Sequence, residues 1–200
     1  MRHQVPLTET MAATVLALIV SVSGFASTSV QSHTFDPSGA LQAFHERVDA
    51  YAALHRRLAP PPPAVSDADP LTKLLTHQYL ASAIRNARPG ADQGNIFTPD
   101  VTALFRARLA DSLGEIDGDT LLLALNNGVP VPRGLHPIVN ETYTMSTLFR
   151  VPSYVRLGLP AIPAELDYRI AGHDLVLWDL YAGIVVDFMP NAFDARVFTE

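Results

Sequence analysis

Four aspartates lie close together near the C-terminus of this 200-residue chain: Asp167, Asp174, Asp179 and Asp187. Paired carboxylates can act as general acid and general base when one of them is shielded from water. Asp179 and Asp187, together with the neighbouring His173, are therefore the candidate catalytic residues. A structural role competes with this chemistry, because turns favour aspartate and because an acid inside a β-branched run can point outward from an edge strand. We expect Asp187 to point outward in this way.

Aromatic residues accompany these acids, and they suggest binding as an alternative to catalysis. Trp178 and Tyr181 are the candidate ligand-binding residues, because each has a large apolar body and one polar group. The same side chains also fit core positions at strand spacing. We expect any ligand site to lie between the helices and the C-terminal strands, near His173, Trp178 and Tyr181.

Metal-binding patterns are weak in this sequence. His45 and Asp49 are one helical turn apart, but a metal site needs three or more convergent ligands. The acidic run Glu115–Asp119 lacks the glycine and glutamate positions of an EF-hand, so we interpret it as a turn in which Asp119 caps the next helix. The chain has no cysteine. The sequence therefore predicts no metal site and no cofactor, and metal handling by His33, His45 and His55 stays an alternative.

Motifs typical of well-known enzymes are absent. The sequence has no Gly-x-Ser-x-Gly elbow, no Gly-x-x-x-x-Gly-Lys-Ser/Thr phosphate loop, no His-Glu-x-x-His pair and no Gly-x-Gly-x-x-Gly fingerprint. Their absence favours a non-catalytic protein. The catalytic alternative is a hydrolase built from distant segments, in which Asp179 or Asp187 meets a histidine such as His136 or His173 within hydrogen-bond reach.

Helices are predicted wherever a capping residue precedes proline, which suits the first helical position. The pairs are Asp36-Pro37, Asp69-Pro70 and Thr98-Pro99, and apolar residues recur after each at steps of three and four. A tetraproline at 60–63 separates the first two helices, and shorter helices are predicted at 119–125 and around 152–157. The predicted buried face of the second helix consists of Leu71, Leu74, Leu75, Tyr79, Leu80 and Ile84.

Alternating apolar residues after position 165 predict three strands, at 166–170, 175–178 and 184–188, joined by tight turns. An extended strap over 128–143 precedes them, since its prolines exclude a regular helix, and 190–200 is expected to be a frayed tail. The predicted fold class is α+β, with three to four helices followed by a small antiparallel three-stranded meander.

The first 26 residues have the pattern of a secretory signal peptide. Arg2 precedes an uncharged run, Met11–Val22, and Gly24 and Ala26 occupy the small-residue positions before a cleavage site. We therefore predict cleavage after Ala26, a disordered leader at 27–35 and a single α+β domain at 36–200. The run is too short to span a bilayer, so we predict no stable membrane insertion once the signal is removed and a secreted or periplasmic location.

The composition of the chain limits the classes of partner that it can have. The formal net charge is −6, and this acidic balance argues against a nucleic-acid binder, which needs a basic surface. The absence of cysteine excludes disulfides and a lipidated N-terminal cysteine. A protein or small-molecule ligand remains open, and the partner is otherwise unknown.

Two stretches carry a resemblance to known proteins. They are Gly94–Pro99 (GNIFTP), and the C-terminal segment YRIAGHDLVLWDLYAGIVVDF, which ends at Phe188. Together they resemble an uncharacterised family of exported bacterial proteins. The resemblance implies export and a globular fold, and it implies no activity and no site residues. The sequence thus favours an exported bacterial binding or interaction module of the cell envelope, with a periplasmic hydrolase and a periplasmic metal-handling protein as alternatives.

Overall fold

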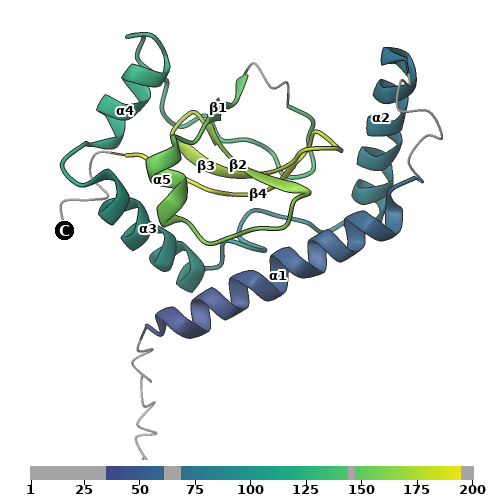
Figure 1. The fold of residues 1–200 in the computed structure, drawn as a ribbon, viewed down its shortest axis with the longest axis horizontal. Helices are drawn as coiled ribbons and strands as arrows, with labels where there is room; N and C mark the ends of the chain where they lie inside the picture. The colour runs from purple at the N-terminus through teal and green to yellow at the C-terminus, as the bar shows by residue number, and fades with distance from the viewer. Residues whose placement is uncertain (1–34, 61–68, 144–146, 195–200) are drawn as a thin grey trace, which may run out of the picture. The chain divides into compact units, whose positions relative to one another are not determined.

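The computed structural model describes residues 35–60, 69–143 and 147–194 (Figure 1). The predicted signal peptide and nearly all of the predicted leader lie outside these ranges. In chain order the elements are α1 (Pro37–Leu58), α2 (Pro70–Ala87), α3 (Pro99–Leu113), α4 (Gly118–Leu125), β1 (Phe149–Arg150), α5 (Ser153–Gly158), β2 (Leu166–Ala171), β3 (Asp174–Asp179) and β4 (Val185–Met189). The predicted α+β class is confirmed. The described part of the chain has five helices and a four-stranded antiparallel sheet.

The three predicted proline starts are confirmed, because α1, α2 and α3 each begin at the expected proline. The carboxylates of Asp36 and Asp69 accept hydrogen bonds from backbone N–H groups in the first turns of α1 and α2, which satisfies donors that a helix leaves unpaired. The predicted cap of α4 is wrong by two positions. Asp117 accepts from the Thr120 N–H at 2.8 Å, and the helix begins at Gly118.

The sheet has the order β1-β2-β3-β4, so it contains one strand, β1, in addition to the three that were predicted. Only Phe149 and Arg150 form β1, which pairs with Ile170 and Arg169 of β2, and a two-residue strand is too short to show alternation. Gly172 opens the tight turn between β2 and β3 with φ 59°, a conformation that glycine adopts without steric cost. At the other edge, the 128–143 strap hydrogen-bonds to β4, because the Asn140 N–H donates to the Val185 carbonyl.

One face of the sheet packs against the helices (Figure 1). Phe44 of α1, Phe97, and Phe105 of α3 make edge-to-face and tilted ring contacts at its centre, with centroids 4.9–6.2 Å apart. Sheet residues Tyr168 and Leu177 complete the same cluster. This core fixes α1 and α3 against the strands.

The opposite face carries a second apolar cluster around Trp178, Val176, Val185 and Phe188. Val139 and Tyr143 of the strap pack against it. Trp178 is 3% exposed, and the Arg169 guanidinium lies over its ring, 5.3 Å from the centroid. Trp178 therefore lies in the interior of the described structure.

The predicted buried face of α2 is only partly correct. Leu80, Ala81 and Ile84 are buried at the C-terminal half of the helix. Periodicity shows which residues share a helix face, but it does not show whether another element covers that face. The exposed members, 52–63% accessible, are Leu71, Leu74, Leu75 and Tyr79.

The predicted frayed tail is wrong for its first part. Ala192 and Phe193 are completely buried, and the Phe193 N–H donates to the His173 carbonyl at 3.0 Å. Residues 195–200 lie outside the described ranges. Among the helices that the structure describes, none is long and apolar enough to cross a bilayer.

Candidate functional site

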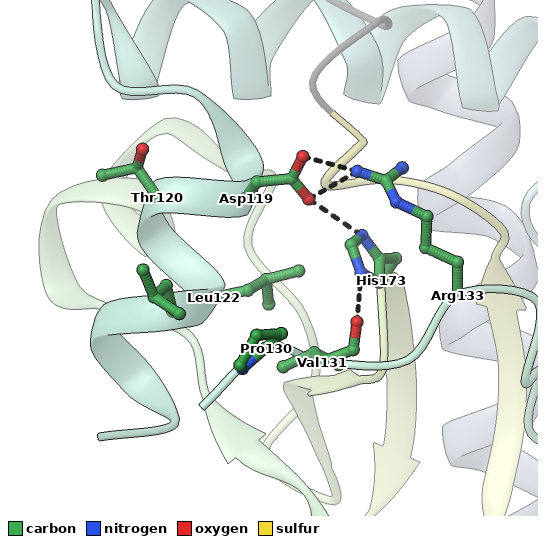
Figure 2. Close-up of a pocket in the computed structure, with 8 residues that line it drawn as sticks. Asp119, Thr120, Leu122, Pro130, Val131, Arg133 and His173 are labelled. Carbon is green, nitrogen blue, oxygen red and sulfur yellow. Dashed lines mark hydrogen bonds and ion pairs between the residues drawn. The ribbon is translucent and has the colours of Figure 1, made fainter. Parts of the chain in front are cut away.

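A cavity of about 340 Å³ lies where α4, the start of the strap and the β2–β3 turn meet. We call it the hairpin pocket, and Figure 2 shows its lining. Volumes of this size suit a small ligand. Its eight lining residues are Asp119, Thr120, Leu122, Leu123, Pro130, Val131, Arg133 and His173.

One side of the hairpin pocket is apolar, and the other carries a charged cluster. Arg133 donates from Nη1 to Asp194 at 2.6 Å and from Nη2 to Asp119 at 2.6 Å. Arg133 and Asp119 are about half exposed, so their pairing contributes little to stability. The pairing does fix the positions of two carboxylates beside the cavity.

His173 lies at the centre of this cluster (Figure 2). Its Nε2 is 3.2 Å from the Val131 carbonyl oxygen, which can only accept, so Nε2 carries a proton. Its Nδ1 lies 2.8 Å from Asp194 Oδ1 and 3.8 Å from Asp119 Oδ1. Nδ1 is buried and lies at ion-pair distance from the Asp194 carboxylate, so this contact holds the ring in place at the pocket wall.

Several contacts place His173 where it lies. It follows Gly172 in the β2–β3 turn, and its carbonyl accepts from Phe193. Phe193 in turn packs against Gly118, where a β-carbon would lie only 2.0 Å from the Phe193 carbonyl oxygen. This close approach seats the first turn of α4, and with it Asp119, beside the turn.

Asp179, a predicted catalytic candidate, lies outside the hairpin pocket. Its Oδ2 accepts from Tyr51 Oη at 2.7 Å and lies 2.6 Å from His55 Nδ1, while Oδ1 accepts from the N–H groups of Tyr181 and Ala182. Burial and the nearby Asp179 carboxylate raise the pKa of Tyr51 far above its usual range. A histidine oriented by a carboxylate can serve as a base, but here both groups are buried and join α1 to the β3–β4 turn.

Asp187 also serves the fold. It is fully buried, so the expectation that it points outward is wrong. Its carboxylate accepts from the N–H groups of Gly94, Ile96 and Phe97 at 2.6–2.9 Å, and from Phe188 at 2.8 Å. Burial raises the pKa of Asp187, and the four N–H groups oppose that shift. The sequence pattern missed this role because the three loop residues lie 90 to 93 positions earlier in the chain.

The other two predicted acids have partners as well. Asp174 lies 2.7 Å from His136 Nδ1 and accepts from the Asn191 N–H, and burial raises its pKa. Asp167 forms an ion pair with Arg169 at 2.8 Å, and both residues are buried.

The structure therefore does not gather the predicted site residues in one place. Among the described residues, His136 pairs with Asp174, His173 with Asp194 and Asp119, and Asp179 with His55. Trp178 is buried on the strap side of the sheet, whereas Tyr181 is 53% exposed with its ring against His55. Of the predicted residues, only His173 lines the hairpin pocket.

The described residues contain no cluster of metal ligands. No group of three or more His, Asp or Glu side chains there is arranged to hold an ion. His55 is engaged with Asp179, and His33 lies outside the described residues.

Sequence reasoning missed Asp119, Arg133 and Asp194 as members of a site. The sequence pattern assigns Asp119 to a helix cap, and Arg133 lies in an irregular strap without periodicity. Only the proline-rich composition of the strap signalled that this segment crosses other elements. The local pattern carries no information about which carboxylate an arginine will reach.

The fold and its cavity define the class as an α+β domain with a small pocket that has one apolar and one charged wall. No family model, curated protein or solved structure matches this chain. The function must therefore be argued from the pocket itself.

Proposed function

We propose that this chain is an exported, non-catalytic binding protein of the bacterial cell envelope that holds a small ligand in the hairpin pocket. The pocket is the observation that carries the proposal. It combines an apolar wall with a few oriented polar groups, the usual composition of a small-molecule site. His173, one of the residues singled out from the sequence, lies within it.

The chemistry of the lining favours binding over catalysis. Thr120 supplies the one side-chain hydroxyl among the eight lining residues, and that hydroxyl donates to Asp117 at 2.8 Å. A hydroxyl engaged in a helix cap is poorly placed to act as a nucleophile, which needs an adjacent base. The two carboxylates of the cluster are paired with Arg133.

The export part of the proposal rests on the first 26 residues of the sequence. N-terminal sequencing of the protein made in a bacterial host tests it. We expect mature chains that begin at Ser27 in the periplasmic or secreted fraction. Recovery of intact chains only from the membrane fraction would contradict export.

Binding is tested by NMR with mixtures of small neutral, cationic and anionic aromatic compounds. We expect shift changes confined to the amides of α4, of Val131 and Arg133, and of His173. Leu123→Trp fills the pocket from a lining position that is 42% exposed, and it should abolish these changes. Leu157→Trp, at an 87% exposed position outside the lining, is the matched control and should keep them.

If none of the neutral, cationic and anionic mixtures shifts the pocket amides, in protein shown to be folded, the binding proposal is refuted. Shift changes that survive Leu123→Trp would place the ligand elsewhere, and they would refute the assignment of this pocket.

A further inference from the structure

The N-terminal half of α2 has an apolar side that is exposed in the described structure. None of its residues from Pro70 to Tyr79 is buried, and the buried residues of the helix begin at Leu80. A helical segment of about ten residues is marginal in water unless a partner covers its apolar side. Exposed apolar patches are typical of contact surfaces. Four large apolar side chains here are 52–63% exposed, and we call them the α2 face: Leu71, Leu74, Leu75 and Tyr79.

Helix geometry gathers these four side chains on one side of α2. At about 100° per residue, they fall within an arc of about 140°. Leu80 and Ile84, which belong to the hydrophobic core, lie outside that arc. The α2 face is therefore directed away from the core of its own chain and is available to a partner.

The α2 face is uncharged, and this limits the partners that suit it. Gln78 and Ser82 are its neutral neighbours within the same arc. The first ten positions of the helix contain one Lys, Arg, Asp or Glu residue, Lys73, which lies about 160° around the helix from Leu75. An uncharged face offers no ion pair to an acidic or basic partner. A second copy of the chain, which its net charge of −6 otherwise repels, meets no like charge there.

The spacing of the α2 face also suits a second copy. Leu71 and Tyr79 lie four residues before and after Leu75, which is about one helical turn in each direction. If two copies of α2 pack antiparallel with a two-fold axis at Leu75, Leu71 of each copy meets Tyr79 of the other. The face is thus complementary to itself, as a two-fold interface requires.

We propose that the α2 face is a homodimer interface, formed when α2 helices of two copies pair antiparallel about Leu75. This inference does not depend on the hairpin pocket. The interface is small, and small interfaces are typical of weak and transient association. We therefore expect dimers at protein concentrations of about 0.1 mM and above, while dilute protein stays monomeric.

An anionic lipid bilayer fits the α2 face less well than a second copy. Helices that lie on such bilayers combine an apolar side with basic residues. Lys73 points away from the α2 face, and the Arg85 guanidinium donates to the Asn140 carbonyl and to the Thr142 hydroxyl of the strap. The net charge of −6 also opposes the approach of the chain to anionic lipid.

Sedimentation equilibrium of the mature protein between about 10 μM and 1 mM tests the dimer. Leu75→Glu and Leu75→Lys each place two like charges across the two-fold axis, so each variant alone should stay monomeric. An equimolar mixture of the two variants should associate again, because unlike charges then face each other. Both variants should fold, since Leu75 is 55% exposed, and circular dichroism checks this. Leu157→Glu, at an 87% exposed position of α5, is the matched control and should dimerise like the wild type.

Salt supplies a second readout that needs no variant. The net charge of −6 makes two copies repel each other, and salt screens that repulsion. Association should therefore tighten severalfold when sodium chloride is raised from about 0.05 M to about 0.5 M. Association that weakens in salt would contradict pairing through an uncharged face.

The outcomes separate the possible occupants of the α2 face. A mature protein that stays monomeric up to about 1 mM at each salt concentration refutes the dimer. Association that survives Leu75→Glu refutes this face as the interface, and a mixture of the two charged variants that stays monomeric refutes the two-fold pairing about Leu75. Monomers that bind phosphatidylglycerol vesicles, and lose that binding in Leu75→Glu, would assign the face to a bilayer. Association confined to chains that retain residues 1–26 would assign it to that segment.

Discussion

Replacing Asp187 with asparagine tests the assignment of this buried carboxylate to the fold. Each of its oxygens accepts two backbone N–H groups: Oδ1 from Gly94 and Phe188, and Oδ2 from Ile96 and Phe97. Asparagine keeps one acceptor oxygen and puts an NH₂ donor at the other position. Whichever way the amide turns, two buried N–H groups then face a donor.

The expected loss of stability follows from the two N–H groups that lose their acceptor. A hydrogen bond to a charged group contributes about 1.5–3 kcal/mol, so two lost bonds cost about 3–6 kcal/mol. The variant no longer buries a charge, which offsets part of that cost. We expect the free energy of unfolding to fall by about 2–4 kcal/mol, a loss that a domain of ordinary stability survives.

Urea unfolding followed by fluorescence measures this loss, because Trp178 is the only tryptophan of the chain and is buried. With a slope of about 2 kcal/mol per molar, the midpoint should drop by about 1–2 M. Hydrogen exchange should show lost protection at Gly94, Ile96 and Phe97 in particular. Asp49→Asn, which makes the same charge change at an exposed position, should stay within about 0.5 kcal/mol of the wild type. An Asp187→Asn midpoint as close to the wild type as that of the control would refute the reasoning.

Three further predictions concern local packing and capping. Gly118→Ala should destabilise the protein by about 2 kcal/mol or more, because the added β-carbon would overlap the Phe193 backbone. Gly90→Ala is the control in thermal unfolding and should be nearly neutral, because the space around Gly90 is open. Leu80→Ala should cost about 2–5 kcal/mol and Leu74→Ala less than about 0.5 kcal/mol in urea unfolding, and equal costs would contradict the exposed face of α2. The backbone and side-chain hydrogen bonds from Thr120 lower the pKa of Asp117. Ionised Asp117 therefore stabilises the folded protein above the pKa that it has in the unfolded chain, and this stabilisation is lost as the pH falls through its lower pKa in the folded protein. An NMR titration that finds no lowering of the Asp117 pKa would contradict the cap.

Local signals in the sequence predicted local structure well. Helix starts at proline pairs depend on residues one to three positions apart, and the three predicted starts are correct. The role of Asp179 was half predictable. Its turn bonds to the Tyr181 and Ala182 N–H groups follow from the preference of aspartate for turns, but its partner His55 lies 124 residues away.

The pocket could not be predicted for the same reason. Asp119, Arg133 and His173 come from three segments without a shared period, and their meeting depends on how the strap crosses the β2–β3 turn. Likewise, the pattern in α2 identified an apolar face correctly but could not show that half of it lacks a covering element.

The carboxylate of Asp187 has a consequence for how this sequence can change over evolutionary time. Its partners from the 94–97 loop are all main-chain amides, so the hydrogen bonds make no demand on the loop's side chains. The hydrogen bonds therefore restrict the acid on β4, which cannot be exchanged alone, but not the identity of the loop residues. The loop residues are restricted by other causes, because Ile96 and Phe97 are buried and Gly94 has φ 90°.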